Sequence, residues 1–108
     1  MDSERTRRQE LSKCIFGQVH RLDVMLAIAD AEGGITATDL AEQLQLPQSA
    51  LQAPLRDLFD AGLLVRDGLR GSRKVFRRVP SLGWQWAHEL ADAAKEPERT
   101  AQVRSIRA

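Results

Sequence analysis

Apolar residues in the first third of the chain recur at steps of three and four. They are Leu11, Cys14, Ile15, Val19 and Leu22, followed by Met25, Leu26 and Ala29. This spacing predicts amphipathic helices to about Asp30, with Cys14 as a small buried side chain on the apolar face. Gly17 is expected to interrupt the first helix. Gly33 and Gly34 are expected to end the second, because glycine accepts non-helical backbone angles.

The start of the next helix carries a capping pattern. Thr36 can accept a backbone hydrogen bond as the N-cap, and Asp39 stands three residues later, at the second position of a capping box. Ile35 and Leu40 flank this cap and suit a hydrophobic staple. The helix is expected to run to about Leu44.

A tight connection over residues 45–47 leads into a further helix, expected over residues 48–61. Pro54 lies inside it, where proline removes a backbone hydrogen bond and clashes with the preceding turn. Two arrangements accommodate the proline. The helix kinks there, or its regular part begins near Gln52 or Ala53, so that Pro54 falls in the tolerated first turn.

The apolar pattern then changes from a helical period to that of strands. Residues 63–66 and 74–79 read as two strands, and residues 67–73 between them are rich in turn formers. Gly62 is a natural C-cap for the helix before the hairpin. A last helix is expected over residues 82–94.

The expected order is helix, helix, helix, turn, helix, hairpin, helix. This order predicts a mainly α fold with a two-stranded wing, a winged helix-turn-helix, as one domain over residues 1–94. The first few residues and the polar tail over residues 95–108 lack sustained periodicity, and we expect them to be mobile.

The net charge of +1 hides two blocks of opposite sign. Residues 22–62 carry seven acidic side chains and one basic one, Arg56, for a formal charge of −6. Residues 63–80 carry six basic side chains and one acidic one, Asp67, for a formal charge of +5. A polyanion is attracted to the second block and repelled by the first.

The stretch over residues 21–80 resembles bacterial winged-helix regulators of the ArsR and MarR types. The resemblance is carried by RLDVMLAIA at residues 21–29 and by the segment over residues 36–64. In that segment the family positions are held by Asp39-Leu40-Ala41, Leu44, Leu46, Leu55, Leu58 and Ala61-Gly62-Leu63. The resemblance implies a transcription regulator that binds double-stranded DNA. It does not imply metal sensing, because no cysteine or histidine stands at residues 36–38.

Two groups of polar side chains are candidates for DNA contact. The exposed positions expected on the recognition helix are Gln48, Ser49, Gln52 and Arg56. The candidates on the wing are Arg66, Arg70, Ser72, Arg73, Lys74 and Arg77. Glutamine and arginine can bond base edges in the major groove, while wing cations contact phosphates and the minor groove. The alternative is a solvated polar helix face and a charged surface hairpin.

The terminal helices are the candidate dimer interface, since the resemblance implies pairing through them. The expected contact residues are Leu11, Cys14, Ile15, Trp86 and Leu90. Leu82, Trp86 and Leu90 share a stripe of the last helix, whereas Trp84 faces another side. Packing of these helices within one protomer is the alternative, and a small-molecule pocket around Trp84 a lesser one.

The remaining chemistry is sparse. His20 and His88 each have one carboxylate at helical spacing, Asp23 and Asp92, which is too few ligands for a metal site. We find no nucleotide-binding loop or catalytic triad, so we expect no enzyme, no cofactor and no metal, and nothing points to an effector. A lone cysteine and the lack of a membrane-length apolar run suggest a cytoplasmic protein.

These patterns leave two functions open. The first is a dimeric, sequence-specific transcription regulator, acting as a repressor, with recognition helices in successive major grooves. The second is a winged-helix module that binds proteins and little or no DNA. The basic hairpin favours the first, while Pro54 and the acidic block favour the second.

Overall fold

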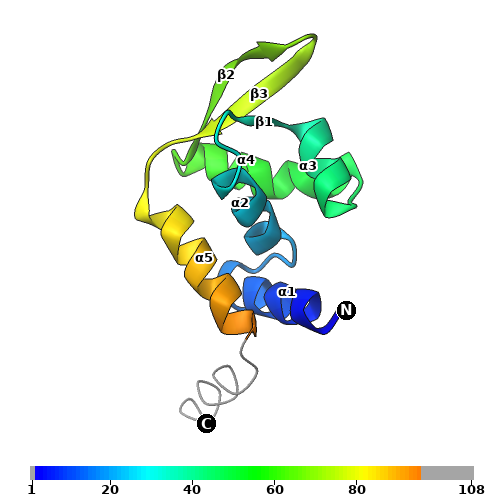
Figure 1. Cartoon of the computed structure of the whole chain (residues 1–108), viewed down its shortest axis with the longest axis vertical. Coiled ribbons are helices and arrows are strands. Elements are labelled where there is room, and N and C mark those ends of the chain that lie inside the picture. Colours follow the sequence, from blue (N-terminus) through cyan, green and yellow to red (C-terminus); the bar gives the residue numbers. More distant parts are fainter. Residues whose placement is uncertain (1, 96–108) are drawn as a thin grey trace.

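The computed structural model describes residues 2–95, which form one winged helix-turn-helix (Figure 1). Its elements are α1 (Asp2–Phe16), α2 (Arg21–Ala29), β1 (Ile35–Thr36), α3 (Ala37–Leu44), the 3₁₀ helix η1 (Gln48–Leu51), α4 (Gln52–Asp60), β2 (Leu64–Arg70), β3 (Arg73–Arg78) and α5 (Leu82–Lys95). The β2–β3 hairpin lies at one end of the molecule and α1 with α5 at the other, with α2 to α4 between them. The order of these elements confirms the predicted fold class, a mainly α winged helix-turn-helix. Apart from Lys95, the expected mobile tail lies outside the described residues.

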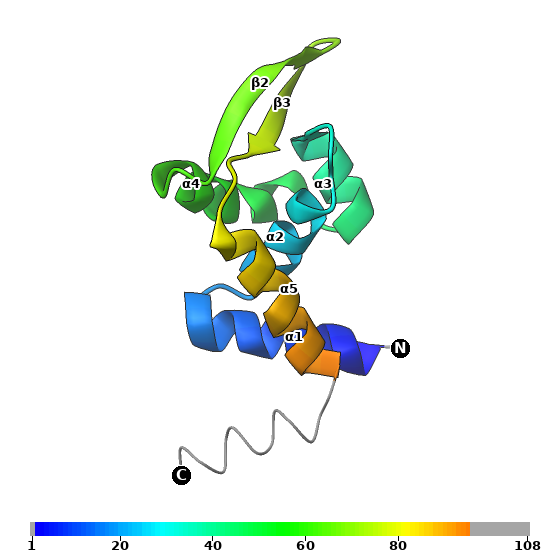
Figure 2. The ribbon, with the colours of Figure 1, turned by 60° about the vertical axis from the view of Figure 1, so that its left-hand side comes forward.

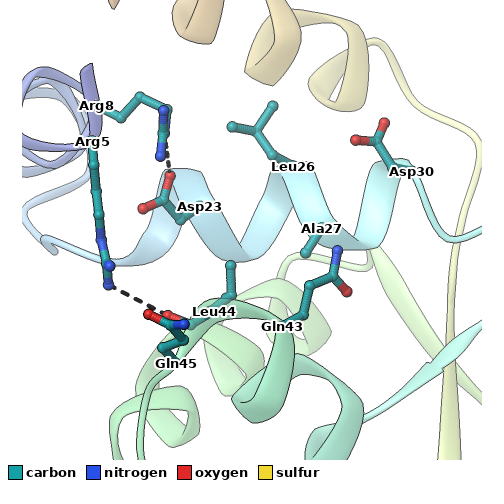
Figure 3. Close-up of a pocket in the computed structure, with 9 residues that line it drawn as sticks. All are labelled: Arg5, Arg8, Asp23, Leu26, Ala27, Asp30, Gln43, Leu44 and Gln45. Atoms are coloured by element: carbon teal, nitrogen blue, oxygen red, sulfur yellow. Dashed lines mark hydrogen bonds and ion pairs between the residues drawn. The ribbon is translucent and has the colours of Figure 1, made fainter. Parts of the chain in front are cut away.

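The N-terminus differs from the expectation of a mobile start, because α1 begins at Asp2. This part of the helix is held by polar contacts, which produce no apolar periodicity in the sequence. Arg8 Nε donates to Asp23 Oδ1 at 2.7 Å and Arg5 Nη2 to the Leu44 carbonyl at 3.3 Å (Figure 3). Arg7 Nε donates to the carbonyl of Ala94 in α5.

The prediction of which side chains of α1 face the core is partly wrong. Cys14 is exposed, not buried. The inner position of this turn belongs to Ser12, which is fully buried and hydrogen-bonded. Its hydroxyl donates to the carbonyl of Gln18 and accepts from the backbone N–H of Leu22 at 3.0 Å. A polar side chain therefore faces the core here, because the bend between α1 and α2 supplies partners for it.

The core lies where α2 meets α3, α4 and α5. Its fully buried side chains include Leu22, Ile28, Leu40, Leu51 and Leu58. Trp84 of α5 belongs to the same cluster, and its Nε1 donates to the Val79 carbonyl at 2.8 Å. Trp84 is thus packed against its own chain.

The capping box is confirmed. Asp39 N–H donates to Thr36 Oγ1 at 3.1 Å, and Thr36 N–H donates to Asp39 Oδ2 at 3.4 Å. Ile35 and Leu40 are both buried, as a staple requires. The sequence did not predict that Ile35 and Thr36 also form β1, which pairs antiparallel with β3. A strand of two residues has no alternation by which to recognise it.

Of the two arrangements considered for Pro54, the structure shows the second. Residues Gln48–Leu51 form a separate 3₁₀ turn, and regular helix begins at Gln52. Pro54 is the third residue of α4, where a missing N–H costs little because first-turn N–H groups have no intrahelical partner. Gly62 ends this helix at φ +77 in a Schellman arrangement, with its N–H donating to the Phe59 carbonyl.

The wing is longer than expected, and the loop is correspondingly shorter. The two strands remain paired up to Arg70 opposite Arg73, which leaves a two-residue turn at Gly71 and Ser72. Gly71 has a φ of +66 at the first turn position, as a type II′ turn requires. A register shift between Arg66 and Leu69 adds one residue to β2, at a bulge. The hairpin extends at one end of the molecule, above α3 and α4 (Figure 2).

Candidate nucleic-acid interface

The four recognition residues lie on the exposed side of η1 and α4. Gln48 and Ser49 are exposed on the 3₁₀ turn, and Gln52 and Arg56 are exposed one turn apart on α4. Residues at i and i+4 share a helix face, so Gln52 and Arg56 point to the same side. Gln48 is held in place, because its Nε2 donates to Thr38 Oγ1 on α3 at 3.2 Å.

The six wing candidates are all exposed, but they differ in their partners. Arg70 Nη1 lies 3.4 Å from Asp39 Oδ2, and Arg77 Nη1 lies 3.4 Å from Asp67 Oδ2. Among residues 2–95, no carboxylate lies within ion-pair distance of Arg66, Arg73 or Lys74. We call these three residues the free wing cations.

The basic block contains one further arginine, and its role is structural. Arg78 Nη1 donates to the carbonyls of Ile28 and Ala31, at 3.3 and 3.1 Å. A cation at the C-terminal end of a helix is favourable because the last carbonyls of the helix are unpaired. Arg78 therefore joins the wing to the end of α2 and is not available for DNA.

A hollow of about 300 Å³ brings Gln48 together with Ser72, Arg73 and Lys74 of the wing, whereas the other six candidates are not part of its lining. Its walls come from the start of α3, from η1 and from the wing. The lining residues are Thr36, Ala37, Thr38, Gln48, Ser72, Arg73, Lys74 and Phe76. Hydroxyl, amide and cationic groups thus converge on one opening. Thr38 was missed from the sequence, where its only signal was its place in the first turn of a capped helix.

The acidity of the helix-turn-helix block is partly compensated. Three of its seven acids pair with arginines within the described residues: Asp23 with Arg8, Asp39 with Arg70 and Asp57 with Arg21. Arg8 and Arg21 both lie before the block. The strongly negative formal charge of the block therefore overstates its repulsion of a polyanion.

The structure divides the five candidate dimer residues into two groups. Leu11 and Leu90 are half-buried against the protomer's own core, whereas Cys14, Ile15 and Trp86 are exposed. Leu82 and Val19 are further exposed apolar side chains, on α5 and beside α1. Since α1 and α5 also pack on each other, the terminal helices serve both the protomer and an outer apolar face.

The two histidines do not assemble a metal site. His88 Nε2 lies 3.2 Å from Asp30 Oδ1 on α2. No group of three or more His, Cys, Asp or Glu side chains lies close enough to hold a metal ion in the part of the chain described. Between residues 2 and 95 there is also no helix with the length and apolar character needed to cross a bilayer.

Several solved structures share this fold. MepR, a transcription regulator of the Staphylococcus aureus multidrug efflux pump MepA, superposes with a TM-score of 0.66 at 18% identity, over 95% of this chain and 76% of that one. MepR in complex with DNA gives a TM-score of 0.65 at 18% identity, over 93% and 74% of the two chains.

The multiple antibiotic-resistance repressor MarR from Listeria monocytogenes gives a TM-score of 0.58 at 14% identity, over 93% of this chain and 65% of that one. No curated protein matches the sequence significantly. The sequence model of the MarR family matches residues 18–74, which span α2, the helix-turn-helix, β2 and the start of β3. That match covers more than half of the 108 residues, and the chain therefore belongs to the MarR family.

Proposed function

We propose that this chain is a DNA-binding transcription regulator of the MarR family that acts as a homodimeric repressor. The observation that carries the proposal is the hollow that the free wing cations Arg73 and Lys74 line together with Gln48 of η1. A protein that binds DNA needs cations for phosphates and polar side chains near base edges. Both kinds of group line this one hollow.

Two comparisons support the proposal. MepR, which shares the fold, has been crystallised with DNA, and the Listeria protein is a repressor. The two features that favoured a protein-binding module have lost weight. Pro54 does not kink the recognition helix, and three of the seven acids of the block pair with arginines.

Two copies are proposed to pair through the outer apolar face of α1 and α5. Ile15 and Trp86 are 40% and 43% exposed there, and Leu82 is 77% exposed. Packing these side chains against the same face of a second protomer would remove apolar surface from water. A two-fold dimer would place two recognition helices on successive major grooves of a palindromic site.

The proposal is tested by fluorescence anisotropy with a labelled palindromic duplex. Replacing Arg73 or Lys74 by Gln is expected to weaken binding to every duplex, because phosphate contacts carry no sequence information. Lys13→Gln is the matched control, since it removes the same charge from α1 at the far end of the molecule (Figure 1). Wild-type protein that binds no duplex in a salt-sensitive way would refute DNA binding and favour the protein-binding module.

A further inference from the structure

A closed polar cluster joins the recognition helix to the start of α2. Arg21 Nη2 donates to Asp57 Oδ2 on α4 at 2.5 Å, and Gln18 Nε2 donates to the same oxygen at 2.8 Å. Arg21 Nε donates to Gln18 Oε1 at 3.1 Å and closes the ring. These three side chains therefore fix one another's positions.

The other side of Arg21 rests on aromatic rings. Its guanidinium carbon lies 5.4 Å from the centre of the Phe16 ring, in cation–π geometry. The Phe16 ring in turn meets the Trp86 ring of α5 edge to face, with centroids 5.6 Å apart. A continuous series of contacts thus runs from α4 through Arg21 and Phe16 to the outer apolar face.

Apolar and polar contacts both hold α4. Leu55 and Leu58 are buried in the core and the Phe59 ring meets the Phe76 ring edge to face, so these contacts set which face of the helix turns inward. Apolar burial itself is non-directional and therefore tolerates small rotations of the helix. Charge-assisted hydrogen bonds are directional, and the planar guanidinium group restricts where Asp57 can lie.

The position of Asp57 matters because of its neighbours on the same short helix. It directly follows Arg56, and Gln52 lies one turn before Arg56. One residue corresponds to about 100° of helix rotation, so a small rotation at Asp57 re-aims both exposed side chains. The Arg21 side chain is only 17% exposed and that of Asp57 34%, so water screens this pair less than a surface pair.

We infer that Arg21 is a positioning residue for the recognition helix. It holds Asp57 from one side and is seated on Phe16 from the other, so α1, α2 and α5 together set the angle at which Gln52 and Arg56 meet the bases. Arg21 does not itself touch DNA in this account. The inference rests on the proposed DNA-binding function and specifies which residue controls its sequence selectivity.

A second ion pair offers a matched control. Arg8 and Asp23 lie 2.7 Å apart with side chains 23% and 10% exposed, but they join α1 to α2 and do not involve α4 (Figure 3). If Arg21 only stabilises the fold, then Arg8→Gln and Arg21→Gln should affect DNA binding alike. If Arg21 positions α4, only Arg21→Gln should reduce sequence selectivity.

The experiment compares the affinities of the full chain for two duplexes. One is the sequence that the wild-type protein enriches from random DNA, and the other is a scrambled version with the same composition. The variants are Arg21→Gln, Asp57→Asn, the double variant and Arg8→Gln, each with a thermal unfolding curve. Arg21→Gln removes a positive charge and Asp57→Asn removes a negative one, so simple electrostatics would move DNA affinity in opposite directions.

Both single variants are expected to lower the ratio of selected to scrambled affinity by about fivefold or more, the size of one lost base contact. The double variant should lose no more than either single one, because the two residues act through the same contact. Arg8→Gln should lower the unfolding temperature and leave the ratio unchanged.

Two outcomes would overturn the inference. In the first, Arg21→Gln keeps the wild-type ratio; in the second, Arg8→Gln lowers the ratio as much as Arg21→Gln. A wild-type protein that binds no DNA would instead refute the proposed function itself, and this inference with it. The two failures are distinguished by the wild-type titration alone.

Discussion

Gly33 and Gly34 follow each other after α2, yet their surroundings differ. Gly34 has a φ of +88, and a Cβ placed on it would lie 2.7 Å from Val75 Cγ1 and 3.0 Å from the Phe76 carbonyl oxygen. Gly33 has open space around the same position. Only the second glycine is therefore required, because it lets the loop pass close to β3.

Gly34→Ala is expected to lower the free energy of unfolding by about 2 kcal/mol or more, through left-handed strain and the clash with β3. Gly33→Ala, the control, should change it by less than about 0.5 kcal/mol. Urea unfolding measures both variants. Equal effects would show that the close approach of this loop to Val75 is wrong.

Gln45 is the one non-glycine residue with positive φ among those described, at +56. It lies at the end of α3, where the Leu46 N–H donates to the Ala41 carbonyl at 3.0 Å. Glycine is the usual residue at such a position because a side chain there is strained. This strain could not be predicted from the sequence, since glutamine is common inside helices.

Gln45→Gly is expected to raise the free energy of unfolding by about 0.5–1 kcal/mol, because the strain disappears. The same substitution at Gln43, inside α3, should lower it by about 0.5 kcal/mol through lost helix propensity. Chemical denaturation of the two variants should therefore give shifts of opposite sign. Shifts of the same sign would contradict the left-handed geometry at Gln45.

At the scale of elements, the helices were predicted well where local chemistry marks their ends. Thr36 with Asp39 marked the start of α3, and Gly62 marked the end of α4. Local sequence patterns did not predict elements that form only because a distant part of the chain pairs with them. β1 exists only because β3 lies beside it, and the wing strands extend because they pair with each other past the bulge.

The capping box at the start of α3 has a measurable contribution. Thr36→Ala is expected to lower the free energy of unfolding by about 1 kcal/mol, because the Asp39 N–H loses its acceptor. Thr36→Ser should restore most of the loss, since serine keeps the hydroxyl. Thermal or urea unfolding of both variants checks this, and a serine variant as weak as the alanine one would count against the cap.

At the scale of the molecule, the candidate site was predicted as two separate groups of residues. The sequence placed cations on the wing and polar residues on the recognition helix, and the structure places Gln48 of the one group and Ser72, Arg73 and Lys74 of the other around one hollow. Which cations are free was not predictable. Arg70 and Asp39 are 31 residues apart, and Arg21 and Asp57 are 36 apart, so only the tertiary fold brings them together.

Self-association is likewise a property of the whole molecule. Trp86→Glu is expected to weaken the proposed dimer severely, because it places a charge in a surface that must lose water to pair. Leu69→Glu is the control, since Leu69 is 68% exposed on the wing, away from α1 and α5. Sedimentation equilibrium should show a monomer only for the first variant, and a wild-type monomer at all concentrations would refute the dimer.

The central claim is that the free wing cations bind DNA phosphates, and the salt dependence of binding tests it most directly. The double variant Arg73→Gln with Lys74→Gln removes two of these cations from each protomer. For the proposed dimer, which loses four cations, the slope of log affinity against log salt concentration should become shallower by about 3.6 relative to wild type, since each phosphate contact contributes about 0.9. A double variant with the wild-type slope would contradict the account.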